Sequence, residues 1–245
     1  MPKSEGVCLV IGAGDDTGAA IAKAFASEGL TACLVRRPRH AEALEGLAQS
    51  IIADGGKAVA CPCDARDEEA MATLVERIES EIGPIEVAVF NIGANVRFSI
   101  TETTGRVFRK VWEMACFSGF LMGREAAARM KIRGRGTILF TGATASVRGA
   151  DGFAAFSAAK HGLRALAQSM ARELGPQNIH VAHIVIDGAI DSNFIRENIP
   201  DVDAKRDDDA ILNPDDIATN YVMLHKQRRT AWTHELDLRP WKEAW

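Results

Sequence analysis

The sequence predicts an α/β fold: a three-layer, doubly wound parallel sheet of about seven strands with helices on both faces. Short apolar runs alternate with helical patterns along the chain, which is the order of strand–helix–strand units. A glycine-rich turn separates the first apolar run from the first helical pattern. The sequence shows no internal repeat and no Pro/Ser-rich linker, so we expect residues 1–245 to form one domain.

The expected strands are short apolar segments bounded by glycine, proline or polar residues. In chain order they are Gly6–Ile11, Leu30–Val35, Lys57–Cys63, Ile85–Phe90, Thr137–Phe140, Ile179–Ile186 and Trp232–Leu238. The fourth strand is apolar almost throughout, which is typical of a strand buried on both faces of a sheet.

The expected helices carry apolar residues at three- and four-residue spacing. They run from the glycine-rich turn to Gly29, from His40 to Ala53, from Asp67 to Ile82, from Thr104 to Ile132 and from Ala155 to Leu174. Asp67 is expected to cap the third helix, because its carboxylate can accept from a free N–H group of the first turn. Gly83 and Pro84 then end that helix.

An acidic stretch, residues 191–216, precedes the last expected strand. It is long for an irregular connection, so we expect either a lid or a solvated loop. Its acid run, Asp207-Asp208-Asp209, is most simply solvated, and as part of a lid it would favour a cationic or neutral substrate.

The composition excludes several classes of protein. Lysine plus arginine is 29 and aspartate plus glutamate is 33, so the formal charge of −4 gives no footprint for nucleic acid or an anionic membrane. The apolar segment Val7–Ile11 is too short for a signal peptide, and no apolar run is long enough to cross a bilayer. We therefore expect a cytoplasmic protein.

The five cysteines indicate neither a disulfide framework nor a metal site. Their number is odd and the chain is long, which argues against a disulfide-stabilised fold. Cys61 and Cys63 form one close pair, but no second ligand pair accompanies it, so no metal is expected.

The glycine-rich turn, Gly12 to Gly18, is suited to binding phosphate. Glycines let the backbone turn sharply and approach a pyrophosphate, and the following helix offers free N–H groups to the anion. Because this turn lies between a strand and a helix at the start of a parallel α/β pattern, we expect nucleotide binding.

This segment resembles the fingerprint T-G-x-x-x-G-x-G of the short-chain dehydrogenase/reductase family, whose fold is of the Rossmann type. Gly12 and Gly18 match its outer glycines, Ile11 replaces its threonine, and Asp16 stands at its middle glycine. The adjacent acids Asp15 and Asp16 would repel a pyrophosphate. The alternative is that one of them caps the helix and points away.

The resemblance extends to about Leu238 and implies further cofactor contacts. Asp64 matches the acid beside the adenine, and Asn91-Ile92-Gly93 is similar to an N-A-G segment. Asp187 to Ser192 resembles P-G-x-x-x-T, whose backbone holds the nicotinamide carboxamide. The residues expected to bind the cofactor are Gly12, Gly14, Asp16, Thr17, Gly18, Arg36, Asp64, Asn91, Gly93, Lys160, Gly188, Ile190 and Ser192.

The segment after the second strand, Val35-Arg36-Arg37, favours NADP(H) over NAD(H). It holds no acid that would accept the ribose hydroxyls of NAD, and Arg36 is suited to a 2′-phosphate. Asp15 is a contrary sign, and a solvated arginine pair is the alternative.

The resemblance also implies a catalytic set, of which one member is present. The family pairs a tyrosine proton donor with a lysine four residues later on one helix face, and adds a serine and an asparagine. Lys160 matches the lysine as a ribose ligand, or is a surface lysine. The tyrosine, serine and asparagine positions hold Phe156, Ala143 and Cys116, so we identify the chain as an atypical member.

Other side chains are less suited to replace the tyrosine. Ser157 lies about 100° around the helix from Phe156 and should face elsewhere. Cys116 acts as a nucleophile only if its pKa is lowered. Tyr221, the only tyrosine, lies beyond the acidic stretch. The groups that would reach the site through water are Thr144, Ser146 and Asp187.

Three functions fit these residues. The first is an NADP(H)-binding oxidoreductase of this family that acts on an unknown small carbonyl or alcohol by a non-standard proton donor. The second is a catalytically inactive dinucleotide-binding sensor or oligomer partner. The third is a lyase or isomerase on the same scaffold, because a fold does not fix the chemistry.

Two helices are expected to support an oligomer. In the resembling family, the helix before Thr137 and the helix that carries Phe156 form a dimer interface. Both are rich in small residues here, so we expect a homodimer or homotetramer. Ordinary packing of these helices on the sheet is the alternative.

Overall fold

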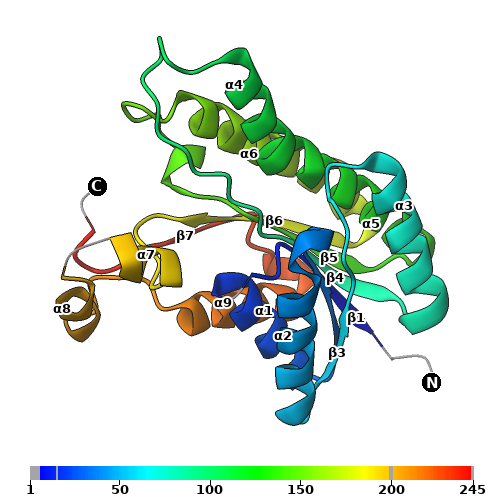
Figure 1. Ribbon diagram of the computed structural model, residues 1–245. Coiled ribbons are helices and arrows are strands. Elements are labelled where there is room, and N and C mark those ends of the chain that lie inside the picture. Colours follow the sequence, from blue (N-terminus) through cyan, green and yellow to red (C-terminus); the bar gives the residue numbers. More distant parts are fainter. Residues whose placement is uncertain (1–5, 15, 199–200, 244–245) are drawn as a thin grey trace.

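A computed structural model describes residues 6–14, 16–198 and 201–243 as a parallel sheet between two layers of helices (Figure 1). All seven strands of the described residues pair in parallel, in the order β3-β2-β1-β4-β5-β6-β7. They are β1 (Val7–Ile11), β2 (Thr31–Val35), β3 (Lys57–Ala60), β4 (Ile85–Phe90), β5 (Gly136–Thr141), β6 (Ile179–Ile186) and β7 (Glu235–Leu238). The predicted fold class is confirmed.

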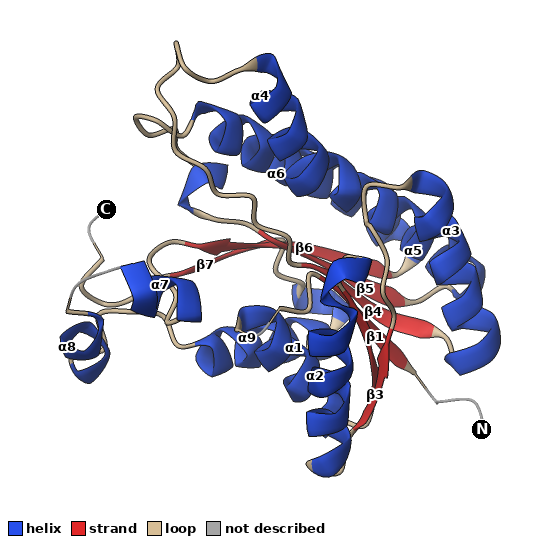
Figure 2. Ribbon diagram, in the orientation of Figure 1, coloured by secondary structure: helices blue, strands red, loops and turns tan. Residues whose placement is uncertain are grey.

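Helices cover both faces of the sheet, as Figure 2 shows in blue. One layer consists of α1, α2 and α9, and the other of α3, α4, α5 and α6. Their bounds are α1 (Thr17–Ser27), α2 (Ala41–Ala53), α3 (Glu68–Arg77), α4 (Gly105–Trp112), α5 (Ser118–Arg133), α6 (Ala154–Leu174) and α9 (Pro214–Lys226).

Side-chain caps set the beginnings of α3 and α4. The carboxylate of Asp67 accepts the Ala70 N–H at 3.0 Å, which confirms the predicted cap of α3. Thr104 caps α4 in the same way, with its hydroxyl 3.2 Å from the Val107 nitrogen. A π-helical segment, Glu113–Phe117, joins α4 to α5. The predicted helix from Thr104 to Ile132 is therefore one long helix with an internal irregularity.

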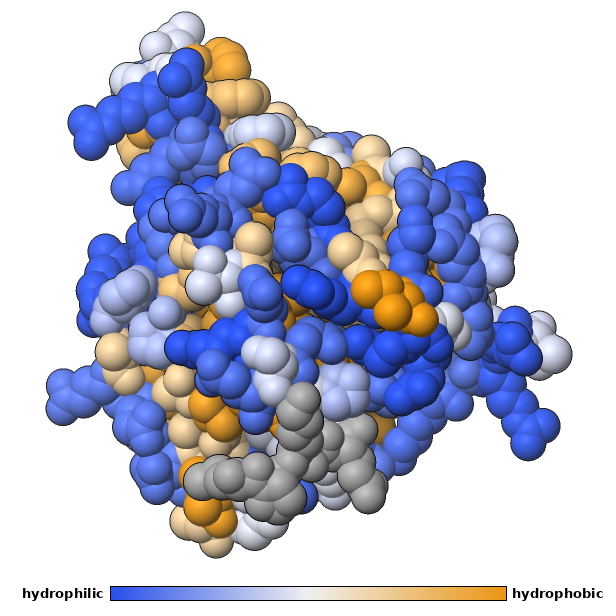
Figure 3. Space-filling model, turned by 90° about the vertical axis from the view of Figure 1, so that its right-hand side faces the viewer, coloured by the Kyte–Doolittle hydropathy of each residue, from blue (hydrophilic) through white to orange (hydrophobic). Residues whose placement is uncertain are grey.

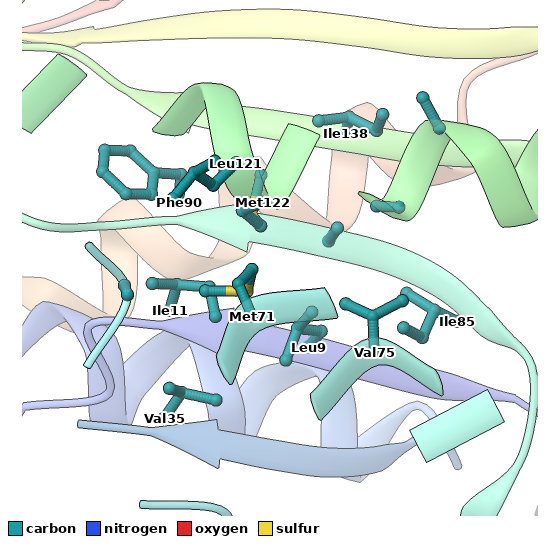
Figure 4. Packing of buried hydrophobic residues seen from close by; sticks show 14 of the residues in the cluster. Leu9, Ile11, Val35, Met71, Val75, Ile85, Phe90, Leu121, Met122 and Ile138 are labelled. Atoms are coloured by element: carbon teal, nitrogen blue, oxygen red, sulfur yellow. The ribbon is translucent and has the colours of Figure 1, made fainter. Parts of the chain in front are cut away.

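The central strands lie in an apolar core. Figure 4 shows Leu9 and Ile11 of β1 beside Met71 and Val75 of α3. All four side chains are fully buried, and β1 is buried along its whole length. Burial on both faces explains why the central strands read as continuous apolar runs instead of alternating ones.

The two edge strands are shorter than predicted. β3 ends at Ala60 and β7 begins only at Glu235. The Cys61 N–H still donates to the Leu34 carbonyl at 2.8 Å, so the chain after β3 stays beside β2. An edge strand pairs on one side only, and fewer backbone bonds therefore fix its ends.

Residues 191–216 contain helical segments, whereas the sequence indicated an irregular connection. They contain two short helices, α7 (Asn193–Asn198) and α8 (Val202–Asp207), beyond the β7 edge of the sheet, and the start of α9 (Figure 1). The carboxylate of Asp191 binds both Arg196 and Arg206, at 2.8–3.1 Å. The acid run at 207–209 is exposed, as expected.

Helix α9 was not predicted, although the sequence signals its start. Asn213 accepts the Asp215 N–H at 2.9 Å, and Pro214 occupies the first turn. Asparagine followed by proline is a common helix beginning. Ile217 and Tyr221 are buried against the sheet, so α9 completes the layer of α1 and α2.

The surface over α3 and α5 is mainly polar. Figure 3 shows this face largely in blue, with apolar residues in separate patches. None of the helices in the described ranges combines the length and the apolar character that a membrane crossing requires.

Candidate cofactor and active site

A cleft opens at the carboxyl ends of the strands, where the strand order reverses between β1 and β4. In doubly wound sheets this switch point is the usual ligand site. One cavity, of about 550 Å³, extends from the glycine-rich turn to the beginning of α6. A second, of about 240 Å³, lies toward the end of β2. The two cavities share the lining residues Gly12, Gly14, Asn91, Ile92 and Gly93.

The glycines of the turn are required by close backbone contacts. Gly12 has a φ of +92°, and a Cβ there would lie 2.8 Å from the Asn91 carbonyl oxygen. A Cβ at Gly18 would lie 2.3 Å from the Gly12 oxygen. Gly14 has no such neighbour within 4 Å, so its backbone is open to a ligand. Asn91 closes the turn by donating its side-chain N–H to the Gly12 oxygen at 3.2 Å.

Asp16 is held by a distant segment instead of capping α1. It stands at the N-cap position, but its side chain makes no capping hydrogen bond. One carboxylate oxygen accepts the backbone N–H of Asn193, at the start of α7, at 3.1 Å. Of the two acids that were alternatives for a helix cap, Asp16 does not cap α1, and Asp15 lies outside the described residues. Asp16 and Thr17 both line the larger cavity.

The smaller cavity is rich in cationic side chains. The predicted residues Arg36 and Asp64 line it, together with Arg37, His40 and Arg66. Arg66 binds the Asp64 carboxylate through two nitrogens, at 2.9 and 2.5 Å, and this pairing lowers the pKa of Asp64. Burial and the neighbouring arginines lower the pKa of Arg37. Sequence reasoning missed Arg66, although its spacing of two residues from Asp64 is a signal for such a pair.

Lys160 lies at the floor of the larger cavity, not on the surface. Its ammonium group donates to the carbonyl oxygens of Thr141 at 2.8 Å and Ile92 at 3.1 Å. Only 2% of the residue is exposed, and burial lowers its pKa to about 8. The lysine thus connects α6 to the ends of β4 and β5, close to the glycine-rich turn.

The three positions that resemble the catalytic tyrosine, serine and asparagine lie near this lysine. Phe156 and Ala143 line the larger cavity, and the Phe156 ring centre is 5.9 Å from the Lys160 nitrogen. Cys116 is buried against the same part of α6. Burial raises the pKa of the Cys116 thiol, so a nucleophilic thiolate is not favoured there.

Ser157 lines the cavity, and the expectation that it faces elsewhere is wrong. It lies three residues before Lys160, so the two share one face of α6, and both line the cavity. Its hydroxyl oxygen is buried and has no hydrogen-bond partner among the described residues. The helix approaches the cavity with a face wide enough for both Phe156 and Ser157.

Asp187 is buried behind the cavity wall. It accepts a hydrogen bond from the Thr144 hydroxyl at 2.6 Å and from Arg148 at 3.2 Å, and pairs with Arg239 at 3.0 Å. Ser146 instead accepts the Ala143 N–H at 3.0 Å. Asp187 and Ser146 thus make local contacts, whereas Thr144 and Arg148 also line the cavity.

Tyr221 is fully buried in the core and lies outside both cavities. Its hydroxyl is 2.7 Å from the Thr141 hydroxyl, and burial raises its pKa. The remaining predicted cofactor residues, at the end of β6, do reach the cleft. Lining the larger cavity are Gly188, Ile190 and Ser192.

Solved structures with the same architecture cover nearly the whole chain. A short-chain dehydrogenase from Rhodopseudomonas palustris is 48% identical, with a TM-score of 0.82 over 98% of this chain and 100% of that one. A metagenomic short-chain oxidoreductase in complex with NADP is 25% identical, with a TM-score of 0.81 over 97% of each chain. A 7α-hydroxysteroid dehydrogenase with NADH and 7-oxo glycochenodeoxycholic acid is 26% identical, with a TM-score of 0.87 over 98% and 95%.

The family described as short chain dehydrogenase matches residues 6–202, which include the glycine-rich turn, Lys160 and the end of β6. The cleft residues, their burial and the switch-point position agree with that match. This chain belongs to the short chain dehydrogenase family.

Proposed function

We propose that this member of the family is an NADP(H)-dependent oxidoreductase acting on a small carbonyl or alcohol without the usual proton donor. The observation that carries the proposal is the position of Lys160. Its buried ammonium group stands between the ends of β4 and β5, in the cavity that begins at Gly12. When bound, a nicotinamide dinucleotide supplies or accepts the hydride of such a reaction.

The residues of the cleft fit a dinucleotide. Gly14 leaves its backbone open to a pyrophosphate, and Gly188 and Ile190, after β6, line the same cavity. Asp16 is held by the Asn193 N–H, which draws its charge toward α7.

The preference for NADP(H) is supported by the smaller cavity. Arg36, Arg37 and Arg66 line it, and the one described acid there, Asp64, is paired with Arg66. Guanidinium groups bind phosphate oxygens well, so the 2′-phosphate of NADP is the ligand group that this cavity favours.

The proton is proposed to come from a group other than a tyrosine. Phe156 has no proton to give, and Ala143 has no hydroxyl to orient a carbonyl. Lys160, whose pKa is lowered to about 8 by burial, and Ser157 both line the cavity. The Lys160 ammonium group can protonate an alkoxide directly or through water, and the Ser157 hydroxyl can relay such a proton but not supply it.

A catalytically inactive dinucleotide sensor is the second candidate, favoured by the apolar groups at Phe156 and Ala143. Restoring both hydroxyls with Phe156→Tyr/Ala143→Ser is then expected to create activity, because a positioned general acid contributes about 10²–10⁴-fold. The measurement is NADPH oxidation with a panel of small ketones. Phe153→Tyr, in the same cavity, is the matched control. Measurable turnover by the wild type, as fast as that of an active double variant, would exclude the sensor.

The test of the proposed function is a calorimetric titration with NADPH, NADP, NADH and NAD. We expect micromolar binding with tighter affinity for the phosphorylated forms, and at least tenfold weaker binding by Lys160→Ala. Lys131→Ala, at an exposed site on α5, is the control. Failure of all four dinucleotides to bind would overturn the proposal, and equal affinities would overturn the NADP preference alone.

We also propose a homodimer or homotetramer, and a cytoplasmic location. The exposed aromatic side chains of Phe108, Trp112 and Phe120 on α4 and α5 support an interface there.

The small residues of α5 also serve packing within the chain. A Cβ at Gly119 would lie 2.6 Å from Leu163 of α6.

A further inference from the structure

One wall of the larger cavity is formed by residues other than those expected to bind the dinucleotide. It is built from the segment between β5 and α6 and from the first turn of α6. Most of its side chains are apolar, namely Ala143, Ala145, Ala150, Phe153 and Phe156. Thr144 and Ser157 are polar, and Arg148 is charged. Apart from Lys160 at the floor, it is the only cation among the described residues that line this cavity.

Arg148 is oriented by a buried carboxylate behind the wall. Its guanidinium donates one hydrogen bond to Asp187, at 3.2 Å. Asp187 is fully buried and already has shorter contacts, to the Thr144 hydroxyl at 2.6 Å and to Arg239 at 3.0 Å. Arg239 in turn forms two hydrogen bonds with Asp237, at 3.1 and 2.7 Å, so its charge is shared between two carboxylates. The 3.2 Å contact with Asp187 fixes the orientation of the Arg148 guanidinium. The Arg148 side chain is 43% exposed, so part of the fork stays accessible.

At the rim beside this wall, a backbone hydrogen bond and side-chain contacts link two loops. The Phe98 N–H donates to the Gly152 carbonyl at 2.9 Å, which joins the loop after β4 to the loop before α6. Arg97 lies over the Phe153 ring at 5.8 Å and pairs with Asp151 at 3.8 Å. Arg97 is thus engaged outside the cavity, whereas Arg148 lines the inside.

We propose that Arg148 binds a carboxylate on the substrate, and that the rest of the substrate is apolar. A guanidinium fork matches the two oxygens of a carboxylate, and the alanine and phenylalanine side chains suit a hydrocarbon body. One guanidinium group can hold one carboxylate through paired hydrogen bonds. A phosphate group would call for several cations, as at the smaller cavity. This inference rests on the proposed function, since it names the substrate class of the same site.

The test compares an acid with its neutral amide. We choose 3-phenylpropanoate and 3-phenylpropanamide as probes, with binding measured by calorimetry or ligand-observed NMR, with and without NADP. The acid is expected to bind at least tenfold more tightly than the amide. Arg148→Gln should remove this preference, Arg148→Lys should keep part of it, and Arg97→Gln should leave it unchanged.

The outcomes separate this inference from the proposed function. Equal binding of acid and amide, binding of neither, or an unchanged preference in Arg148→Gln would overturn the inference. A dinucleotide titration on the same preparations shows whether the oxidoreductase proposal stands independently. Circular dichroism and the midpoint of thermal unfolding check that each variant is folded. If Arg148→Gln proves unfolded, the Arg148→Lys variant decides, because an acid preference equal to that of the wild type would contradict a guanidinium fork.

Discussion

At the scale of single residues, Lys160 shows how burial changes an ordinary side chain. Its ammonium group exchanges water for two backbone carbonyl groups, those of Thr141 and Ile92. Two hydrogen bonds do not replace full hydration, so the charged form is disfavoured. The result is an amine with a pKa of about 8, which can hold or release a proton near neutral pH.

This shift predicts a pH dependence of stability. The pKa of lysine in an unfolded chain is about 10.4, so between about pH 8 and 10 the unfolded chain binds more protons than the folded chain. The contribution of Lys160 to the free energy of unfolding therefore rises with pH in this window. Urea unfolding should show the wild type gaining stability relative to Lys160→Met from about pH 8 to 10. A difference that is independent of pH would mean that the amine titrates normally.

Ala94 is a second notable residue, because its backbone conformation is unusual. It follows the predicted cofactor segment Asn91-Ile92-Gly93, and its φ is +105°, a region that suits glycine. Strain of this kind costs on the order of 1–3 kcal/mol.

Glycine at this position should relieve the strain. After the entropy cost of glycine and the loss of one methyl group, we expect Ala94→Gly to stabilise the protein by about 0.5–1 kcal/mol. Ala145→Gly, in a segment with negative φ, should destabilise it by a similar amount. Chemical denaturation measures both. A loss of stability in Ala94→Gly would show that packing at this position outweighs the strain.

At the scale of elements, α7 and α8 depend on ion pairs more than on the core. Asp191 receives Arg196 and Arg206, and these guanidinium groups hold its pKa far below the ordinary value. Both helices have only six residues, too few to be stable alone.

Removing this charge should loosen the two helices without unfolding the sheet. In Asp191→Asn we expect a several-fold faster hydrogen exchange in α7 and α8 and an unchanged rate in β1 and β4. Asp207→Asn, at an exposed acid of the same segment, is the control. Equal exchange rates in Asp191→Asn and the wild type would contradict the role given to these ion pairs.

At the scale of the whole molecule, the strand order brings segments from distant parts of the chain together at the carboxyl ends of the strands. The chain passes outward from β1 to β3 and then returns to β4 on the other side of β1. The carboxyl ends of β1, β4, β5 and β6 therefore all meet the cleft. On the outer side, α4, the π-helical segment after it and α5 carry an aromatic row, in which the ring centres of Trp112 and Phe117 lie 5.7 Å apart.

The proposed oligomer can be tested on this row. Light scattering should give two or four times the chain mass of 26.4 kDa. Trp112→Glu should lower that mass, because a charge in an apolar interface is costly. Ile52→Glu, at an exposed apolar residue of α2, should not. A wild-type protein with the mass of one chain would contradict the proposal.

The sequence by itself determined the order of the strands and of most helices, the glycine-rich turn and the position of Lys160. These follow from short-range causes. Apolar periodicity reflects which faces are buried, glycine spacing reflects backbone geometry, and caps act within one helical turn. The sequence also contains a signal for the beginning of α9, Asn213 followed by Pro214, from which that helix could have been predicted.

Only the tertiary structure decided which distant groups meet. The contacts of Asp16 with Asn193, Thr141 with Tyr221, and Asp187 with Arg239 join segments that are far apart in the chain. No local pattern encodes such pairs, because they form only when the packed core brings those backbones together and burial makes an unpaired polar group costly. For this reason the turn and the lysine were found from the sequence, whereas Arg148, Ser157 and the anchoring of Asp16 were not.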